Sequence, residues 1–519
     1  MKEVGSAVDE VWAQLGSFGR YTLIHYALLL VPCYLYGMYG SVYNFEAMDI
    51  KYRCKVPQCE GINETLWLDY AIPKENNKLS KCKRYRFFNE TDQCDLKGFS
   101  GEIIGCDSYV YNGVDSVVKD FDLGCQNWKR TLIGTMYGAG FFLSLTTTGI
   151  LSDKYGRIKA LAVASFSSGV FGLIRSFSIN YEMLIATEFL ETAFGAGAYN
   201  AAFVLGMELV QPKGRVFGNT LINFAYISGT MTLSLLAWYL QNWRYLLRTI
   251  YTPAIFIITY LFVLNENPRW LLSKGRYEEA LIVIKKAETM NNTKIREEVF
   301  TSLKAGTNQK EIEAHESFLS VLRKMLASKI IALRVLLCCY LWMTCSFTYY
   351  GLSINSVFLA GNKYLNFSLV AFVEIPANFV CLMILDKFGR KKVLVTVYML
   401  SAIFCMSLSF IPEDLSIWRL VFYLCGKFSI TIAYSTVYVT VSEVFPTNAR
   451  QSLLAFCATT GRIGSTLAPQ TPLLALYYVN MPTIFFACVA LIASMLALTL
   501  PETINKTLPD NLEEAKSFS

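Results

Sequence analysis

The chain of 519 residues is 54% apolar and 17% charged, with a mean hydropathy of +0.36 and a net charge of +7. Soluble globular domains carry about 25% charged residues and about 45–50% apolar ones, so the composition argues against a soluble protein and favours one embedded in a lipid bilayer. The small net charge gives no reason to expect a nucleic-acid partner.

The amino-terminal segment, residues 1–20, carries apolar side chains at helical spacing. These are Val8, Val11, Leu15 and Phe18. The pattern predicts a short amphipathic helix, which we expect to lie on the membrane surface.

Twelve apolar runs follow, and each approaches the roughly 20 residues that a helix needs to cross a bilayer. The runs cover residues 21–43, 131–151, 160–178, 183–206, 216–240, 245–264, 331–357, 367–385, 392–411, 416–441, 451–476 and 482–500. They predict an all-α membrane protein with twelve transmembrane helices.

A polar stretch, residues 44–130, separates the first two runs and contains six of the chain's 15 cysteines. The six are Cys54, Cys59, Cys82, Cys94, Cys106 and Cys125. An even number of cysteines in a polar segment favours disulfides on an oxidising, non-cytosolic side. A zinc site is the alternative, but only one pair has short spacing and the segment contains no histidine. The sequence does not choose among the possible pairings.

The same stretch contains two glycosylation sequons, at Asn63 and Asn89, and each asparagine is followed by Glu-Thr. Sequons are modified in segments that face away from the cytosol. The sequons and the cysteines therefore indicate the same side of the membrane for this loop.

Short loops on the other side carry basic residues such as Lys154 and Lys387. Basic residues favour the cytosolic side, so we expect both chain ends in the cytosol. A charged, helix-prone linker over residues 265–330 and a tail over residues 501–519 belong to the same side. The linker either tethers the flanking segments or regulates them.

One motif occurs twice. Asp153-Lys-Tyr-Gly-Arg157 returns as Asp386-Lys-Phe-Gly-Arg390, 233 positions later. Each copy stands where a helix leaves the membrane, and its Asp and Arg can pair with each other or with a neighbouring helix end. We expect such pairs to hold the cytosolic mouth shut in one conformation and to break in the other. The alternative is basic anchoring with a turn glycine.

Two further landmarks repeat at nearly the same offset. Glu208 and Arg215 correspond to Glu443 and Arg450, and Glu266 corresponds to Glu502. The two Glu…Arg pairs join the expected gate. The chain is therefore a duplicated unit with halves over residues 1–264 and 331–500, and such membrane proteins bind their substrate where the halves meet.

Five stretches resemble a known family. Gly149-Ile-Leu-Ser-Asp-Lys-Tyr-Gly-Arg-Ile-Lys resembles the loop motif of the major facilitator superfamily, and four others resemble its organic cation, carnitine and organic anion branch, solute carrier family 22. The four are Asn127-Trp-Lys-Arg-Thr-Leu, Glu266-Asn-Pro-Arg-Trp-Leu-Leu-Ser-Lys-Gly-Arg, Glu443-Val-Phe-Pro-Thr-Asn-Ala-Arg and Pro501-Glu-Thr…Leu508-Pro-Asp. The resemblance implies two pseudo-symmetric six-helix bundles that alternate access to a central cavity.

Four charged residues stand out inside the predicted helices, where charges are costly and usually functional. They are Glu191, Glu374, Lys427 and Arg462. The alternative for each is an ion pair that holds helices together. Because Gly426-Lys427-Phe428 resembles a stretch found throughout the family whatever the substrate, we do not expect Lys427 to select the substrate.

Glu374 and Arg462 discriminate between branches of the family. The stretch around Glu374 resembles cation and carnitine transporters, whereas anion transporters tend to have an aspartate with a lysine four residues on, where this chain has Asn378. At Arg462 the chain is similar to carnitine and anion transporters. An acid for an ammonium and an arginine for a carboxylate suit a carnitine-like zwitterion. Alternatively, the two residues neutralise each other.

Aromatic residues add to the expected binding site. Trp342 and Tyr349 lie seven residues apart on one face of a predicted helix, and they match aromatic residues that line the pocket of cation carriers. Tyr199 matches a further aromatic position there. Such rings attract quaternary ammonium groups, although each could instead serve ordinary helix packing. Further polar contacts are expected from Asn223, Tyr226, Asn355 and Gln470.

We therefore expect a multi-pass plasma-membrane carrier of organic cations or zwitterions, with the lipid bilayer and a small-molecule substrate as partners, acting as a monomer or weak oligomer. An organic anion exchanger and a non-transporting sensor of the same fold are the alternatives. The sequence contains no nucleotide loop, metal cluster or nucleophile arrangement, so we expect neither an enzyme nor a cofactor. A coupled sodium ion or proton leaves no signature in the sequence.

Overall fold

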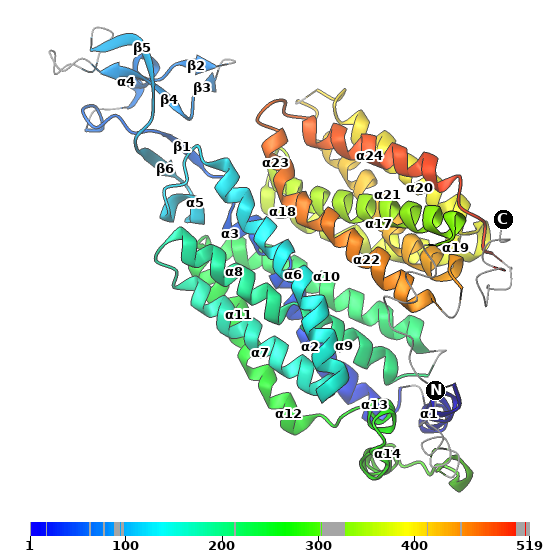
Figure 1. Ribbon diagram of the computed structural model, residues 1–519. Coiled ribbons are helices and arrows are strands. Elements are labelled where there is room, and N and C mark those ends of the chain that lie inside the picture. The colour runs from blue at the N-terminus through cyan, green and yellow to red at the C-terminus, as the bar shows by residue number, and fades with distance from the viewer. Residues whose placement is uncertain are drawn as a thin grey trace.

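The computed structural model describes residues 2–16, 18–61, 64–75, 78–87, 94, 98–211, 214–300, 303, 327–412, 414–446, 449–504 and 514. The apolar segments are helical, because a backbone in lipid must satisfy its own hydrogen bonds and a helix does so within one segment. The helices form two groups that lie side by side, and β-strands project from one end of the molecule (Figure 1).

The first half of the chain forms the amino-terminal helix group. Its elements are α2 (Arg20–Tyr39), α6 (Asn127–Tyr155), α7 (Arg157–Ser176), α8 (Tyr181–Gly195), α9 (Gly197–Glu208), α10 (Arg215–Leu240), α11 (Trp243–Phe256), η2 (Ile257–Thr259) and α12 (Tyr260–Val263). The second half forms the carboxy-terminal group. Its elements are α17 (Lys329–Asn355), η3 (Ser356–Phe358), α18 (Lys363–Phe372), α19 (Glu374–Phe388), α20 (Arg390–Ser407), α21 (Ser416–Val444), α22 (Arg450–Leu467), η4 (Ala468–Gln470), α23 (Thr471–Leu474) and α24 (Met481–Ala497).

Each predicted membrane run coincides with one of these helices or with a consecutive set of them, so the predicted helical membrane fold is confirmed. In the described part of the chain, seven helical segments are long and apolar enough to cross a membrane by length and composition alone. The remaining runs are shorter or more polar. Their polar residues are acceptable in a membrane because neighbouring helices cover them.

Two of the runs are interrupted. The eighth run breaks at Val373, between α18 and α19, because Pro376 lacks the N–H that would bond to the carbonyl four residues earlier. The fourth run breaks at Ala196. It lies between two glycines, whose conformational freedom weakens a helix. The first break leaves Glu374 at the start of α19, in the middle of the membrane run.

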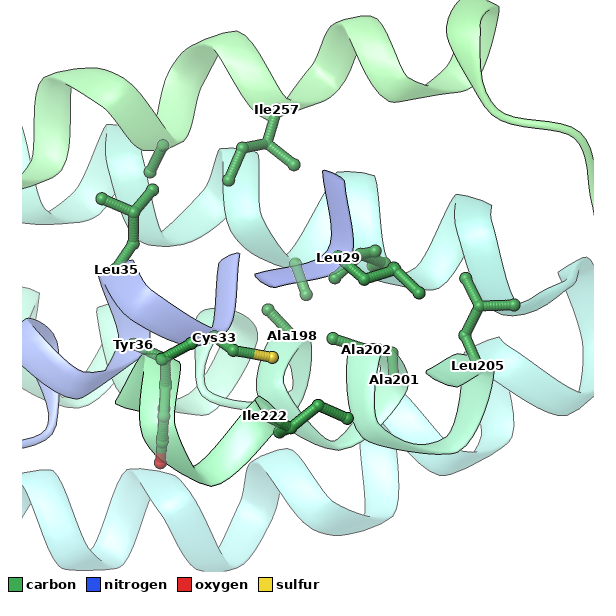
Figure 2. Close-up of a cluster of buried hydrophobic side chains, with 14 of the residues drawn as sticks. Leu29, Cys33, Leu35, Tyr36, Ala198, Ala201, Ala202, Leu205, Ile222 and Ile257 are labelled. Atoms are coloured by element: carbon green, nitrogen blue, oxygen red, sulfur yellow. The ribbon is translucent and has the colours of Figure 1, made fainter. Parts of the chain in front are cut away.

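Each helix group has its own hydrophobic core. Figure 2 shows part of the amino-terminal core, where Leu29 and Cys33 of α2 lie beside small side chains of α9. The labelled residues of these two helices are Leu29, Cys33, Leu35, Tyr36, Ala198, Ala201, Ala202 and Leu205. Small residues let helices in a membrane approach closely, and Gly37 of α2 and Gly229 of α10 meet too tightly to admit a Cβ.

The two groups contact each other at the end from which the strands project. There α6 packs against α22 and η4, and α10 packs against α18. We call the first of these contacts the α6–α22 seam. A Cβ on Gly138 would lie 2.7 Å from Thr466, and one on Gly134 would lie 2.7 Å from Pro469. Across the second contact, Ser234 donates to the carbonyl of Tyr364 at 2.7 Å.

The polar loop folds into short strands and helices. Antiparallel pairs join β1 (Lys51–Cys54) to β6 (Tyr109–Asn112), β2 (Lys74–Glu75) to β3 (Lys78–Leu79) and β4 (Lys83–Phe87) to β5 (Phe99–Gly105), alongside α3 (Tyr43–Glu46), α4 (Glu64–Ala71) and α5 (Val117–Asp120). Disulfides link Cys54 to Cys106, Cys59 to Cys94 and Cys82 to Cys125. The predicted disulfides are thus present, and the fold selects their pairing. The sequon residues Asn63 and Asn89 lie outside the described residues.

The amino-terminal segment forms helix α1 (Lys2–Leu15), as its spacing predicts, but its apolar side chains do not lie on a membrane surface. They are buried against the linker helices α13 (Pro268–Ser273) and α14 (Tyr277–Asn291). Asp9 also pairs with Arg269 at 2.5 Å and with Arg215 at 3.3 Å. The charges and the apolar stripe together hold α1 on the protein.

Candidate functional site

A cavity lies between the two helix groups, beside the α6–α22 seam. Much of its wall is aromatic, with rings from Tyr36, Tyr43, Tyr137, Phe141, Tyr226, Tyr349, Tyr350 and Phe367. The charged side chains in its lining are Glu374 and Arg462. The cavity thus combines aromatic faces with one acid and one base, which is a composition suited to a small polar ligand.

Glu374 forms an ion pair inside the membrane. Lys427 of α21 brings Nζ to 2.9 Å from Oε1 of Glu374. The same Nζ donates to Ser353 Oγ at 2.8 Å and to the backbone carbonyl of Tyr349 at 3.2 Å. It also lies 3.2 Å from the centre of the Tyr349 ring. Because Lys427 is fully buried, its charge depends on these partners.

Arg462 reaches from one helix group to the other. Its guanidinium lies 4.3 Å from the centre of the Phe141 ring, which belongs to α6. Among the residues that the structure describes, no acidic side chain forms an ion pair with Arg462. Since Glu374 pairs with Lys427, the two cavity charges do not neutralise each other. The cavity therefore retains one positive charge that no described carboxylate balances.

Two of the predicted aromatic residues, Tyr349 and Tyr226, line this cavity, while a third lies just behind its wall. The ring of Tyr199 stacks on that of Tyr36 with centres 5.0 Å apart, and it meets Tyr226 edge to face at 5.9 Å. Tyr199 therefore supports two rings of the lining and does not form part of the lining itself.

Trp342 is not among the lining residues. Its ring lies 5.4 Å from the ring of Tyr438, and it fills the space in which a Cβ on Gly461 would stand. Although Trp342 lies on the same side of α17 as Tyr349 by spacing, α21 and α22 cover it. Helical spacing identifies a face but does not say which turns of that face another helix covers.

Three of the four predicted polar residues make contacts between or along helices. Asn223 bonds to Asn219 one turn earlier, and Asn355 donates to Thr471 at 2.8 Å. Gln470 bonds across the seam to Thr131 and Thr135. The structure brings Tyr226 alone of these four into the lining.

The amino-terminal half of the wall was largely missed by the sequence reasoning. Tyr36, Tyr137 and Phe141 did not stand out in a chain that is 14% aromatic. A usable signal was present in α6, where Gly134 and Gly138 flank Tyr137 at the spacing of small residues that mark a helix contact.

The expected gate residues form two matching clusters at the end opposite the strands. The paired atoms are 2.6 Å apart for Arg157–Asp153, 3.7 Å for Arg157–Glu208, 3.2 Å for Arg390–Asp386 and 3.0 Å for Arg390–Glu443. Every one of these pairs joins elements of the same helix group. Of the remaining gate residues, Arg215 pairs with Asp9, and Arg450 is the first residue of α22.

The third repeated landmark caps a helix in each half. Glu266 accepts the backbone N–H of Arg157, the first residue of α7, at 3.0 Å, and Glu502 accepts that of Arg390, the first residue of α20, at 2.9 Å. Burial raises the pKa of Glu266. At Glu502 burial acts in the same direction, but four backbone donors outweigh it and hold the pKa below its ordinary value.

Glu191 does not line the cavity but lies inside the amino-terminal group, where Ser168 donates to it. The same group buries Arg175, which pairs with Glu188 and, at 3.5 Å, with Glu46. The sequence reasoning did not single out Arg175 or Glu188. A charge within an apolar run, the signal used for Glu191, would have identified both.

Comparisons with known proteins agree with this architecture. A family model described as Sugar (and other) transporter matches residues 65–513. The chain is 30% identical to mouse solute carrier family 22 member 21 and 28% identical to human organic cation/carnitine transporter 2, in each case over 98% of this chain and 93% of the other. It is 29% identical to the Drosophila melanogaster organic cation transporter protein, over 98% and 94% of the two chains.

Among solved structures, the xylose transporter XylE from E. coli shares the fold. Its inward open conformation matches with a TM-score of 0.62 and 15% identity, over 96% of this chain and 99% of that one. A partially occluded inward open conformation of XylE gives 0.60 at 16% identity, over 94% and 100%.

Proposed function

The chain belongs to the family of sugar and other transporters and, within it, to solute carrier family 22, and on that premise we propose that it carries carnitine-like zwitterions and organic cations across the plasma membrane. The names of several relatives include organic cations and carnitine. Family membership alone does not choose between these substrates, so the choice depends on the cavity.

The observation that carries the proposal is the presence of Glu374 and Arg462 in one aromatic cavity between the helix groups. Arginine can bind a carboxylate through two parallel hydrogen bonds. A carboxylate and the faces of tyrosine rings attract an ammonium group, each ring by roughly 0.5–2 kcal/mol. A zwitterion with both groups is therefore the ligand whose charges match the site.

We propose that the substrate crosses by alternating access. The helix groups meet at the strand end, where the α6–α22 seam closes one side of the cavity. At the other end, the ion pairs of the two repeated motifs stay within their own groups. This combination supports a conformation in which the cavity opens at the end opposite the strands. Rocking of the two helix groups would then open the cavity at the strand end.

The disulfides support the orientation of this carrier. The three disulfides lie in the strand-bearing loop, and disulfides persist on the oxidising side of a membrane. That side is the outside of the cell for a plasma-membrane protein. An even number of crossings then leaves both chain ends in the cytosol.

The test is an uptake panel in proteoliposomes with radiolabelled carnitine, tetraethylammonium and glutarate, each with and without a sodium gradient. Saturable uptake of carnitine, with weaker uptake of tetraethylammonium, is the expected result. Preference for glutarate would favour an organic anion exchanger. Binding without uptake of any panel member would favour a sensor and contradict transport.

A further inference from the structure

The charges around the cavity do not balance. Glu374 and Arg462 are the charged lining residues, and Lys427 lies directly behind Glu374. One acid and two bases leave a net charge of one positive unit, in a site with low dielectric walls where such a charge acts strongly on a bound ion. A simple cation entering this site meets a field of its own sign.

Lys427 occupies the position that a substrate ammonium would take. Its Nζ lies 2.9 Å from Oε1 of Glu374 and 3.2 Å from the centre of the Tyr349 ring. A carboxylate and an aromatic face are the two features that recognise an ammonium group. In the structure both of these features are already used by a cation of the protein itself.

The remaining contacts of Lys427 do not depend on Glu374. Nζ donates to Ser353 Oγ at 2.8 Å and to the carbonyl of Tyr349 at 3.2 Å. Both acceptors are neutral and stay in place if a ligand takes over the carboxylate. Lys427 can therefore yield Glu374 to a substrate and still satisfy two of its three donors.

We propose that Lys427 is a tethered competitor for the substrate's ammonium group and makes a carboxylate on the substrate a condition for tight binding. A simple cation must share Glu374 with Lys427 and gains nothing from Arg462. A zwitterion shares Glu374 in the same way, but its carboxylate neutralises Arg462 and adds no net charge to the cavity. Lys427 thus determines specificity, contrary to the expectation from its sequence context. This inference rests on the proposed function, because it takes the cavity as the substrate site.

The experiment measures equilibrium binding of radiolabelled tetraethylammonium and carnitine to purified protein in lipid nanodiscs. Lys427→Gln keeps a side chain of similar shape that can bond to Ser353, and it frees Glu374. We expect tetraethylammonium to bind at least about tenfold more tightly, with a smaller change for carnitine. The double variant Lys427→Gln/Glu374→Gln is the matched control and should lose this gain. An unchanged affinity for tetraethylammonium in Lys427→Gln, or a gain that persists in the double variant, would overturn the proposal.

A second measurement covers the case in which Lys427→Gln does not fold. In the unmodified protein, glycine betaine and tetramethylammonium share the quaternary group and differ by the carboxylate. We expect the betaine to compete for the site at least about tenfold more strongly. If glycine betaine and tetramethylammonium inhibit equally, the role of Lys427 is overturned while transport is not. If the betaine competes more strongly as expected but no uptake occurs in proteoliposomes, transport alone is contradicted.

Discussion

Arg462 shows how much one residue can decide at the scale of side chains. It comes from α22, lies over the ring of Phe141 in α6 and has no carboxylate partner in the described part of the protein. Tyr350 forms a side-chain hydrogen bond with Arg462, but a neutral phenol does not balance the buried positive charge. Under the proposed function, the carboxylate of the substrate would balance this charge.

Arg462→Asp should weaken carnitine binding and strengthen that of tetraethylammonium. Loss of a charge-assisted contact costs about 1.5–3 kcal/mol, which corresponds to an increase of about 10–150-fold in the apparent KM for carnitine. Uptake kinetics for both compounds, normalised to the protein at the cell surface, provide the measurement. Equal loss of both substrates would contradict a carboxylate contact.

Trp342→Ala separates packing from ligand binding. Because Trp342 fills the junction of α17, α21 and α22, its removal should destabilise the protein by about 3–5 kcal/mol. The apparent affinities for quaternary and neutral ligands should then change by the same factor. Thermal unfolding and a two-ligand binding assay would check this, and a selective loss of quaternary amines would restore Trp342 to the binding site.

At the scale of elements, the two helix starts capped by Glu266 and Glu502 follow the same construction. Gly156 precedes α7 with φ of +114°, and Gly389 precedes α20 with φ of +89°. These values favour glycine. In both cases a Cβ would also collide with the capping carboxylate. The repeated glycine of the motif therefore has two physical reasons, the turn and the close approach of the glutamate.

Gly156→Ala should destabilise the fold more than Gly275→Ala. Gly275 also has positive φ, at +73°, but no atom lies within 4 Å of its Cβ position. The control should thus cost only the backbone strain, about 1–2 kcal/mol. Gly156→Ala should add the loss of the Glu266 cap and unfold at a lower temperature in a thermal melt. Equal melting temperatures would show that the carboxylate contact contributes nothing.

Element breaks also position the site. Pro376 removes one backbone hydrogen bond in the eighth membrane run, close to Glu374, while the backbone at Val373 stays in the helical region. The carboxylate of Glu374 therefore lies next to a locally weakened turn of the membrane helix. The proline is visible in the sequence, but its consequence for Glu374 follows from helix geometry.

For the whole molecule, the seam between the helix groups determines which side of the cavity is closed. Gly138 and Thr466 meet there without room for a larger side chain. The contact must form and separate in each cycle if access alternates. Small residues at this seam allow the two helices to approach closely.

Gly138→Trp should hold the strand side of the cavity open and abolish uptake. A matched control is Gly149→Trp on the same helix, because no atom lies within 4 Å of the Gly149 Cβ position. A cysteine introduced at Ser465, which lines the cavity, should react with a membrane-impermeant thiol reagent from outside in the first variant and not in the control. Normal uptake by Gly138→Trp would contradict separation of the seam.

The sequence by itself determined the helical membrane fold, the duplication and the two charges of the cavity, because apolar runs and repeated motifs are local patterns that survive without knowledge of contacts. The tertiary structure alone decided the disulfide pairing, the burial of Trp342 and the partner of Glu374. Pairing and burial depend on which distant segments meet in space. Lys427 lies 53 positions from Glu374 along the chain, and only the packing of α21 against α19 brings their charges to 2.9 Å.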